Sequence, residues 1–507
     1  MGFLEDRDLE NVPGIPEYYK GKSIFITGGT GFIGKILIEK LLYSCTNLDK
    51  IYLLLRPKRG ENAAERLKKL YDWQCFDRLR TERPGVFESK VVAIAGDILD
   101  EKLGISQADR ITLIKNIDVV FHVAASVRFD DHLSHAVRLN LKGTLEIIEL
   151  AKEMKKLSAL IHVSTSYSNT NRNPIEEVMY PPHVNWRDLL EVSKNVDYDT
   201  LDILTTKYLG DMPNTYTFTK QLAEHAVYEQ QGVLPAVIVR PSIVVSSISE
   251  PMPGWIDNFN GPVALFVGYS KGIMKSVYAR GDLTSDYIPV DICVKNLITT
   301  AWIRGTKIFE PTDPVPVYNC CANDQLRMTL QSIVDNATVI AQQYPVNDMI
   351  WNHGMTITTS WTLHYILVIL KHILPAIFID SLLWLMGKKP LLVKIQRRIF
   401  RAGIAVSYFS TRNWIFDNTN YLALRECIKE KDIDNFNYDM KDLVIEDYYV
   451  ACCLGGKKFL LKESEDSLPR ARRQFKIMWW LDNIVTVLFY AYIAWRLYNY
   501  ILTNYIN

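Results

Sequence analysis

Short runs of apolar and β-branched residues recur through the first three hundred residues, and longer stretches with helical spacing, such as Ile36–Leu42 and Thr144–Met154, separate them. Continuous apolar strands that alternate with helices are typical of a parallel sheet with helices on both faces. We therefore predict a doubly wound α/β domain over residues 1–330. Its expected strands are Ser23–Thr27, Ile51–Leu55, Val91–Ala95, Val119–Ala124, Leu160–Val163 and Val237–Val239.

The pattern changes after this domain. Residues 351–387 are rich in Trp, Leu and Ile, and six basic residues follow them closely. A polar segment with helical spacing comes next, which favours a mainly helical C-terminal domain over residues 350–465. The basic residues are Lys388, Lys389, Lys394, Arg397, Arg398 and Arg401.

A last apolar and aromatic segment predicts a membrane helix over residues 477–496. Its core, Ile477–Trp495, extends about 28 Å as a helix, which matches the hydrocarbon thickness of a bilayer. Asp482 opposes this, since a carboxylate near the bilayer centre costs roughly 2.5–3.5 kcal/mol, but near the end of the segment it can reach the headgroups. An interfacial helix or a hairpin is the alternative. Basic residues precede the segment and place the catalytic side in the cytosol: Arg470, Arg472, Arg473 and Lys476.

The earlier apolar stretch, residues 361–386, contains Lys371, His372 and Asp380. These polar groups argue against a second crossing. We expect helices that line an acyl tunnel or rest on the membrane, with the basic run meeting anionic headgroups. A buried helix pair beside a solvated basic face is the alternative.

Composition narrows the class of protein. The chain has 507 residues, of which 48% are hydrophobic and 23% charged, which excludes a disordered or fibrous chain. A net charge of +1 argues against nucleic acid as a partner. The eight cysteines form no C-x-x-C motif and the nine histidines are scattered, so we expect reduced thiols in a cytosolic environment and no metal site. The acidic N-terminus predicts no signal peptide, and Asp6 argues against myristoylation at Gly2.

A glycine-rich turn follows the first predicted strand. The pattern G-x-x-G-x-x-G allows a tight turn, close approach of backbone N–H groups to a pyrophosphate, and close packing of helix on strand. The helix that begins there directs the positive end of its dipole at the phosphates. The sequence thus predicts a Rossmann-type dinucleotide site, formed by Gly28, Thr30, Gly31, Phe32, Ile33 and Gly34.

The end of the second strand indicates which dinucleotide binds. Sites for NAD usually place Asp or Glu there to hold the ribose 2′-hydroxyl, whereas this chain has Arg56 and Arg59 and no carboxylate. Guanidinium groups suit a 2′-phosphate, so NADPH is favoured. A solvated basic loop is the alternative.

Three further residues follow predicted strands and are expected at the cofactor. Asp97 and Ile98 come after the third strand, where an adenine ring would lie, and Asp97 could accept a hydrogen bond from its amine. An ordinary turn aspartate is the alternative. Ala124, after the fourth strand, leaves room for the backbone to pass the cofactor.

Tyr216 and Lys220 carry the predicted chemistry. They lie about one helical turn apart and share a face. An ammonium beside a phenol lowers the phenol's pKa, which makes the tyrosine a usable general acid. Ser164 and Thr165 follow the fifth strand, and a hydroxyl there can hold the substrate oxygen that gains negative charge. The order of glycine turn, basic strand end, hydroxyl cluster and Tyr-Lys pair makes the signal specific.

Taken together, these motifs resemble those of the extended short-chain dehydrogenase/reductases, and among them the alcohol-forming fatty acyl-CoA reductases, especially those of insects. The glycine and Tyr-Lys motifs indicate only the superfamily, whereas the PGWIDN stretch and the C-terminal region indicate the family. The resemblance covers nearly the whole chain. Its motifs are TGGTGFIG at 27–34, HVSTSY at 162–167, YTFTK at 216–220, RPSIV at 240–244, EPMPGWIDNFNGP at 250–262, DYIPVD at 286–291 and the region from His372 to Asp380.

The resemblance implies a role for each matching residue. Tyr216 becomes the proton donor, and Lys220 binds the nicotinamide ribose and tunes Tyr216. Thr165 orients the carbonyl, with Ser164 as its rival, and Asn140 supports Lys220 through a water molecule. The residues implied to line the nicotinamide are Arg240, Pro241, Ser242 and Ile243.

The resemblance also implies the reaction: NADPH-dependent reduction of a long-chain fatty acyl-CoA to a primary alcohol through an aldehyde, with release of CoA. An enzyme that stops at the aldehyde, or one that acts on a sterol or another lipid alcohol, is the near alternative. A membrane-tethered NADP-binding scaffold without turnover is the alternative of another class. Membrane lipid is the expected partner. The endoplasmic reticulum is the favoured location, with peroxisome or lipid droplet as alternatives.

One feature departs from simple superfamily patterns. Thr165 and Tyr216 lie 51 positions apart (216 − 165). The segment between them, which contains Pro174, Pro181 and Pro182, is therefore an insertion. We expect it to help cover the substrate, with a surface excursion as the alternative.

Overall fold

The computed structural model describes residues 12–58, 60–307, 310, 312–326 and 328–503. Arg59 and the N-terminal residues Gly2 and Asp6 lie outside the described residues. The chain forms two compact units, each built from three chain segments. Unit one contains the described residues of 1–255, 286–327 and 414–443, and unit two contains those of 256–285, 328–413 and 444–507.

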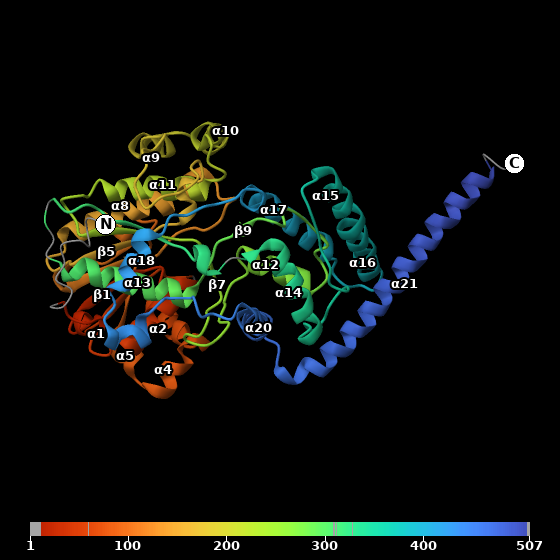
Figure 1. The fold of residues 1–507 in the computed structure, drawn as a ribbon. Helices are drawn as coiled ribbons and strands as arrows, with labels where there is room; N and C mark the ends of the chain where they lie inside the picture. Colours follow the sequence, from red (N-terminus) through yellow and green to blue (C-terminus); the bar gives the residue numbers. More distant parts are fainter. Residues whose placement is uncertain (1–11, 59, 308–309, 311, 327, 504–507) are drawn as a thin grey trace. The chain divides into compact units, whose positions relative to one another are not determined.

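A seven-stranded parallel sheet forms the centre of unit one, which confirms the predicted fold class. Its order is β11-β6-β5-β4-β1-β2-β3 (Figure 1). The run β3-β2-β1-β4-β5-β6 is the strand order of a Rossmann fold. The six predicted strands agree with the observed ones to within two residues at each end, and the seventh, β11, was not predicted. The strands are β1 Ser23–Thr27, β2 Ile51–Leu55, β3 Val91–Ala95, β4 Ile117–His122, β5 Ala159–Val163, β6 Ala236–Pro241 and β11 Val317–Cys320.

Helices cover both faces of this sheet, because alternate apolar side chains of each strand point to opposite sides. Phe25 and Val120 face a core that α8 (Gly143–Glu153) and α11 (Thr215–Tyr228) complete. On the other side lie α2 (Phe32–Ser44) and α13 (Val290–Thr306) (Figure 1). Other helices of unit one are α1 Ile15–Tyr19, α3 Ala63–Tyr71, α4 Asp77–Glu82, α5 Val86–Lys90, α6 Gln107–Asn116, α7 Leu133–Ala136, α9 Trp186–Asn195, α10 Tyr198–Leu209, α18 Thr419–Glu426 and α19 Ile433–Phe436.

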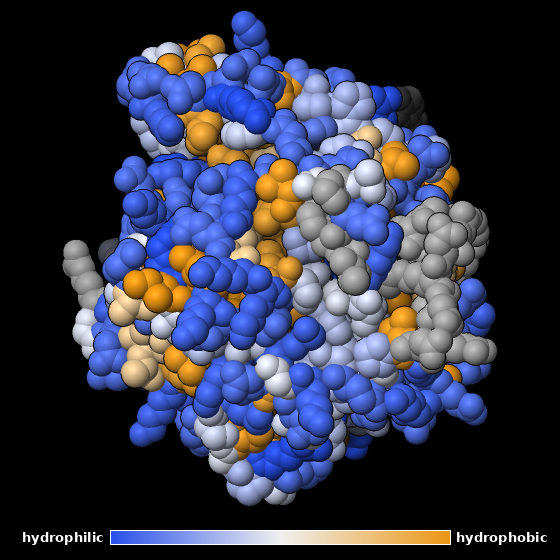
Figure 2. Space-filling model, turned by 90° about the vertical axis from the view of Figure 1, so that its left-hand side faces the viewer, coloured by the Kyte–Doolittle hydropathy of each residue, from blue (hydrophilic) through white to orange (hydrophobic). Residues whose placement is uncertain are grey.

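Two short strands extend unit one beyond the sheet: β7 (Ile243–Val245) pairs in parallel with β10 (Tyr287–Pro289). β7 follows β6 in the chain, and β10 directly precedes α13. The face of the molecule seen in Figure 2 is mostly hydrophilic and carries hydrophobic residues in scattered groups, as expected for a solvated protein surface.

Unit two is mainly helical, as predicted for the C-terminal region. Two pairs of short strands, β8 (Ser276–Tyr278) with β13 (Thr356–Thr358) and β9 (Thr284–Ser285) with β12 (Met328–Thr329), connect its helices. In the described part of the chain, two helical segments are long and apolar enough to cross a membrane, residues 361–385 and 465–501. The helices are α12 Pro262–Ser270, α14 Leu330–Gln343, α15 Trp361–Val368, α16 Leu374–Leu385, α17 Leu392–Ser410, α20 Ile445–Gly455 and α21 Leu468–Ile501.

Candidate active site

The glycine-rich turn between β1 and α2 packs against the end of β4. Gly28 has φ +75°, and a Cβ atom there would lie 2.7 Å from the backbone nitrogen of Ala124. A Cβ atom on Gly34 would lie 2.3 Å from the carbonyl oxygen of Gly28. Because these neighbours are backbone atoms, no side-chain movement could make room. The two glycines are therefore required by the turn itself, and they bring its backbone close to Ala124.

The first turn of α2 fits a pyrophosphate. Gly31 is the N-cap residue and offers no side chain to accept a bond from the first-turn N–H groups. Those groups, which Phe32, Ile33 and Gly34 carry, are the donors that an anion takes at a helix N-terminus. Thr30 precedes them, and its carbonyl accepts a bond from Lys35 Nζ at 3.0 Å. The donor set and the bare helix end together suit the diphosphate of a dinucleotide.

Two predicted cofactor residues meet at the ends of β2 and β3. Arg56 Nη1 lies 3.5 Å from Asp97 Oδ2, and 57% of the arginine side chain is exposed. Asp97 Oδ1 also accepts a hydrogen bond from the backbone N–H of Leu99 at 3.1 Å. Ile98 is buried against Gly143, where a Cβ atom would lie 2.6 Å from it. Parallel strands thus bring Arg56 and Asp97 to one edge of the sheet.

Tyr216 and Thr165 form a hydrogen-bonded pair beyond the end of β5. Asn214 caps α11 by accepting a bond from the N–H of Thr217 at 2.9 Å, which places Tyr216 in the first helical turn. Burial raises the pKa of Tyr216 to about 12, although its bond with Thr165 acts in the opposite direction. The expected lowering of this pKa by Lys220 is therefore not found, because burial outweighs the bond with Thr165 and the charge of Glu224 also raises the pKa.

Lys220 lies one turn further along α11, fully within the protein. Its Nζ donates a hydrogen bond of 2.7 Å to the carbonyl of Val163, the last residue of β5. Burial lowers the pKa of Lys220 to about 8. Ser164, between Val163 and Thr165, is buried, and its hydroxyl has no hydrogen-bond partner among the described residues. The end of β5 is thus followed by two hydroxyls, those of Ser164 and Thr165, and it accepts a bond from the ammonium of Lys220 on α11.

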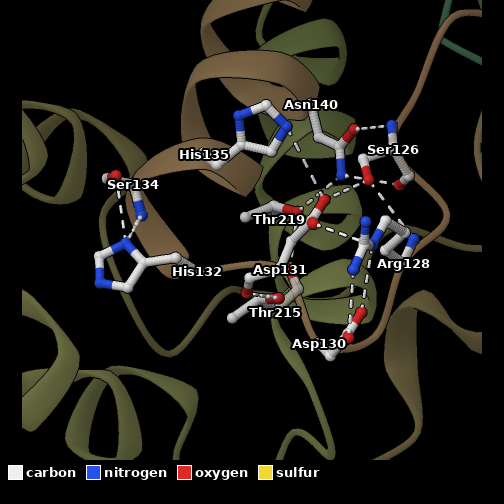
Figure 3. A network of polar contacts seen from close by, with 10 residues as sticks. All are labelled: Ser126, Arg128, Asp130, Asp131, His132, Ser134, His135, Asn140, Thr215 and Thr219. Atoms are coloured by element: carbon white, nitrogen blue, oxygen red, sulfur yellow. Dashed lines mark hydrogen bonds and ion pairs between the residues drawn. The ribbon is translucent and has the colours of Figure 1, made fainter. Parts of the chain in front are cut away.

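Asn140 connects the loop after β4 to α11. Its Oδ1 accepts a bond from the backbone N–H of Ser126 at 2.8 Å, and its Nδ2 donates to Thr219 Oγ1 at 3.0 Å (Figure 3). Ser126 also bonds Asp131, whose carbonyl accepts a bond from Thr215 Oγ1 at 2.8 Å. The side chain of Asn140 therefore bonds Ser126 in the loop after β4 and Thr219, the residue before Lys220. Its predicted contact to Lys220 through water stays a prediction.

A cavity of about 320 Å³ opens at the start of α11, where Asn214 and Thr215 line it. One wall is the loop after β4, where Phe129 stacks on the Tyr216 ring with centroids 5.9 Å apart. The opposite wall is α10, which belongs to the predicted insertion and contributes Tyr198 and Asp202. Thr215 lines the cavity at the start of α11. Sequence analysis missed Phe129, although it follows the carboxyl end of β4, where ligands bind in open α/β sheets.

Arg240 differs from its expected place at the nicotinamide. Its side chain is fully buried and pairs with Glu224 of α11 at 2.8 Å. It also donates to the carbonyls of Glu176 and Val178 at 3.1 Å, and so fastens the insertion to the sheet. A buried guanidinium needs such partners for its N–H groups, and the sequence alone could not show that the insertion provides them. Pro241 and Ile243 follow at the carboxyl end of β6.

Comparison with known proteins adds independent information. Residues 26–297 match a family model of an NAD-binding domain described as male sterility protein, and residues 371–463 match a second model with the same description. Fatty acyl-CoA reductase 1 of Xenopus laevis is 38% identical over 488 residues, which is 96% of this chain and 93% of that protein. Fatty acyl-CoA reductase wat of Drosophila melanogaster is 35% identical over 503 residues, 98% of this chain and 96% of that protein.

Solved structures support the fold. The terminal R domain of the myxalamid biosynthetic pathway has a TM-score of 0.56 at 19% identity, with 86% of this chain and 90% of that chain covered. The reductase domain of a non-ribosomal peptide synthetase from Mycobacterium tuberculosis has a TM-score of 0.54 at 16% identity, with 91% and 97% covered. Full-length similarity to the reductases, together with the NAD(P)-binding Rossmann domain, shows that the chain belongs to the fatty acyl-CoA reductase family of oxidoreductases.

Proposed function

We propose that this protein reduces long-chain fatty acyl-CoA to the primary alcohol in two steps, with NADPH as the hydride donor and CoA as the leaving group. The observation that carries the proposal is the hydrogen-bonded pair of Tyr216 and Thr165 beyond the end of β5. The pair lies one turn from Lys220, and Tyr216 follows Thr215, which lines the cavity. A single site then serves both steps, because each reduces a carbonyl whose oxygen gains negative charge.

Tyr216 and Thr165 act on the substrate oxygen. Thr165 holds the carbonyl oxygen by a hydrogen bond, and Tyr216 donates its phenolic proton to that oxygen as charge develops. The raised pKa of Tyr216 keeps the phenol protonated at neutral pH, which is the state that a proton donor requires. In the first step the protonated product is a hemithioacetal, which collapses to aldehyde and CoA. In the second step the aldehyde accepts a proton at the same position.

The bound NADPH supplies the hydride, and residues of the sheet edge orient it. The first turn of α2 receives the diphosphate, and Lys220 binds the nicotinamide ribose. Arg56 binds the 2′-phosphate by exchanging its present partner Asp97 for a doubly charged anion. Asp97 then becomes free to accept a bond from the adenine amine.

The C-terminal helix α21 serves as the membrane anchor in this proposal. Its apolar second half follows a cluster of basic residues, which favours a catalytic unit on the cytosolic side. The endoplasmic reticulum is the location that we propose, with peroxisome and lipid droplet as the alternatives. Fractionation of cells that express the tagged full chain, with markers for endoplasmic reticulum, peroxisome and lipid droplet, tests the organelle.

The reaction is tested with membranes that contain the full chain, NADPH and a series of acyl-CoAs. We expect two NADPH oxidised for each CoA released, with alcohol as the product. One NADPH for each CoA together with free aldehyde would contradict the second step. Tight NADPH binding without oxidation would contradict catalysis and favour a scaffold. NADH in place of NADPH, at matched concentration, is the control for cofactor choice.

A further inference from the structure

The apolar segment of residues 361–385 buries one narrow stripe and exposes the rest. It is a continuous run of α15, a π-helical turn (η6, Ile369–Ile373) and α16. Its buried residues recur at every fourth position, which is one face of a helix. They are His364, Val368, His372, Ala376 and Asp380.

The polar members of this stripe are all bonded within unit two. His364 Nδ1 lies 2.8 Å from Ser276 Oγ of β8, and His372 Nε2 accepts a bond from the backbone N–H of Lys275 at 2.8 Å. His372, which the sequence counted against a crossing, thus faces the protein, as does His364. One ring nitrogen of each is bonded to β8 or to the residue before it.

Asp380 has the same orientation at the far end of the segment. Its carboxylate accepts backbone N–H bonds of 2.9 Å from Leu391, Leu392 and Val393. Those groups form the first turn of α17, which has no cap from its own N-cap residue. A carboxylate at a helix N-terminus is also favoured by the helix dipole. Asp380 therefore caps α17 and points into the protein, away from the exposed face of the segment, which we call its outer face.

The outer face is apolar and exposed, the reverse of a soluble surface helix. One charged side chain, Lys371, is exposed on this segment. A lysine stem is long enough to bring its ammonium to a lipid headgroup. An apolar face this long differs from the scattered hydrophobic groups of Figure 2 and marks an interaction site. Six residues of the face are between 46% and 72% exposed: Ile366, Leu370, Leu374, Phe378, Trp384 and Leu385.

We propose that this outer face is embedded in the cytosolic leaflet of a lipid bilayer, along which the segment lies without crossing. Lipid is the occupant that the charges favour, because exposed basic residues follow the segment at once and attract anionic headgroups. The same unit also carries α21, whose apolar window is 0% buried. The basic residues are Lys388, Lys389, Lys394, Arg397, Arg398 and Arg401, all of them charged side chains of the α16–α17 connection and of α17.

The buried stripe explains why the segment lies in the leaflet and does not cross it. Its polar side chains are bonded to β8 near the start and to α17 near the end. A crossing would carry β8 or the basic start of α17 into the hydrocarbon, where unpaired backbone and charged groups are costly. An interfacial position leaves every one of these bonds intact.

Photocrosslinking of the full chain in vesicles of phosphatidylcholine and phosphatidylserine tests the proposal. A benzophenone amino acid replaces Phe378, Tyr490 of α21 or Ile203 of α10 in separate variants. Ile203 is 79% exposed and apolar but belongs to unit one, so it is the matched control. We expect lipid adducts from positions 378 and 490 and none from 203. A lipid adduct at 490 with none at 378, or a crosslink from 378 to a second copy of the chain, would overturn the proposal.

A second measurement decides between lying and crossing. Lys388→Cys in sealed microsomes is treated with a membrane-impermeant maleimide, and the labelled peptide is identified by mass spectrometry. We expect labelling without permeabilisation, because both ends of the segment remain on the cytosolic side. Labelling only after permeabilisation would mean that the segment crosses. Neither measurement depends on turnover, so its failure is distinct from failure of the proposed reaction.

Discussion

Tyr216 and Lys220 share one face of α11, yet their side chains have different partners. The phenol bonds Thr165, and the ammonium bonds the carbonyl of Val163. Burial favours the neutral form of each group, so it raises the pKa of the phenol and lowers the pKa of the ammonium. Near neutral pH the phenol is therefore protonated, and the ammonium loses its charge as the pH rises through about 8.

Tyr216→Phe removes the donated proton and little else. We expect kcat to fall about 100-fold or more, the usual contribution of general acid catalysis, while the Kd for NADPH stays unchanged. Tyr228→Phe, at the other end of α11 and outside the cavity lining, is the control and should keep nearly full activity. Steady-state turnover and cofactor fluorescence titration measure both quantities. Full turnover by the Tyr216 variant would remove the phenol from the mechanism.

Lys220 should make cofactor capture dependent on pH. Its pKa of about 8 means that the ammonium is charged below that pH and loses its charge above it. Because kcat/KM reports the ionisation of the free enzyme, kcat/KM for NADPH should fall as the pH rises through 8. Lys220→Arg, which stays charged, should shift this fall to higher pH. A wild-type profile that is flat across the same range would contradict the role of Lys220.

Arg56 should determine the preference for NADPH over NADH. Charge-assisted bonds to a phosphate contribute about 1.5–3 kcal/mol, so Arg56→Ala should raise the Kd for NADPH about 10-fold or more. The Kd for NADH should hardly change. Arg187→Ala is the control, since its side chain is similarly exposed, at 56%, and lies on α9. Equal losses for both cofactors would show that Arg56 does not contact the 2′-phosphate.

At the scale of elements, a buried charge cluster fixes the dinucleotide helix. Glu250 accepts bonds of 2.9 Å from Lys40 of α2 and pairs with Lys295 of α13 at 3.1 Å. Arg78 of α4 bridges Glu250 and Glu39, at 3.1 Å and 2.8 Å. One loop carboxylate thus holds three helices together on one side of the sheet. The family motif that contains Glu250 therefore has a structural role as well as a diagnostic one.

Glu250→Gln should destabilise unit one at neutral pH. Burial raises the pKa of Glu250, but Lys40 and Lys295 outweigh it and lower the pKa from 4.5 to about 2. A carboxyl whose pKa is lower in the folded state stabilises the fold above its unfolded pKa, and that contribution disappears as the pH falls from 4.5 toward 2. The free energy of unfolding should drop by roughly 3 kcal/mol at pH 7.

Urea unfolding of wild type and variant in detergent, at several pH values, measures this difference. The gap between the two proteins should narrow steadily below pH 4.5, where the wild-type carboxyl begins to lose its advantage. Glu149→Gln, an exposed carboxylate of α8 with 63% of its side chain accessible, is the control and should change little. A gap that does not depend on pH would mean that packing, and not charge, holds the loop.

At the scale of the whole molecule, α21 has two different halves. Its first half is bonded to unit two, where Gln474 donates to the carbonyl of Met349 at 3.0 Å and Asp482 accepts a bond of 2.9 Å from Asn352. The indole of Trp351 also bonds Asp482. The residues after it, Ile484–Ile501, are almost all exposed and extend about 27 Å. Asp482 thus bonds protein, where the sequence suggested headgroups, and marks the end of the docked half.

Asp482→Ala should therefore lower the stability of the folded protein without changing the membrane attachment by α21. Loss of two partly buried bonds to a carboxylate should lower the free energy of unfolding by about 1–3 kcal/mol, while resistance to carbonate extraction stays the same. Asn483→Ala, the next residue, whose amide bonds only within the helix, is the control. Stronger membrane retention in the Asp482 variant would instead place that carboxylate in the bilayer. Thermal unfolding and carbonate extraction of the same preparations give both answers.

Features that depend on neighbours along the chain were evident in the sequence alone. The apolar period of the strands, the glycine turn and the spacing of Tyr216 and Lys220 are local, and each predicted element follows from them. β11 was missed because Asn319 interrupts its apolar run. In the structure that amide is buried and donates to the carbonyls of Ile175 and Asp417, residues far away in the chain.

Tertiary structure decided the features that depend on partners brought from a distance. Arg240 pairs with Glu224 and bonds the insertion, and Asp380 caps the start of α17. From the sequence one can state only that burying a polar side chain costs free energy. Whether it can be buried in the fold depends on a hydrogen-bond or charge partner that offsets this cost. Residue types and their spacing therefore determined the family and six of the seven strands of the sheet, and they predicted the chemistry. Only the folded chain determined which polar groups face inward, and hence which surface is left for lipid.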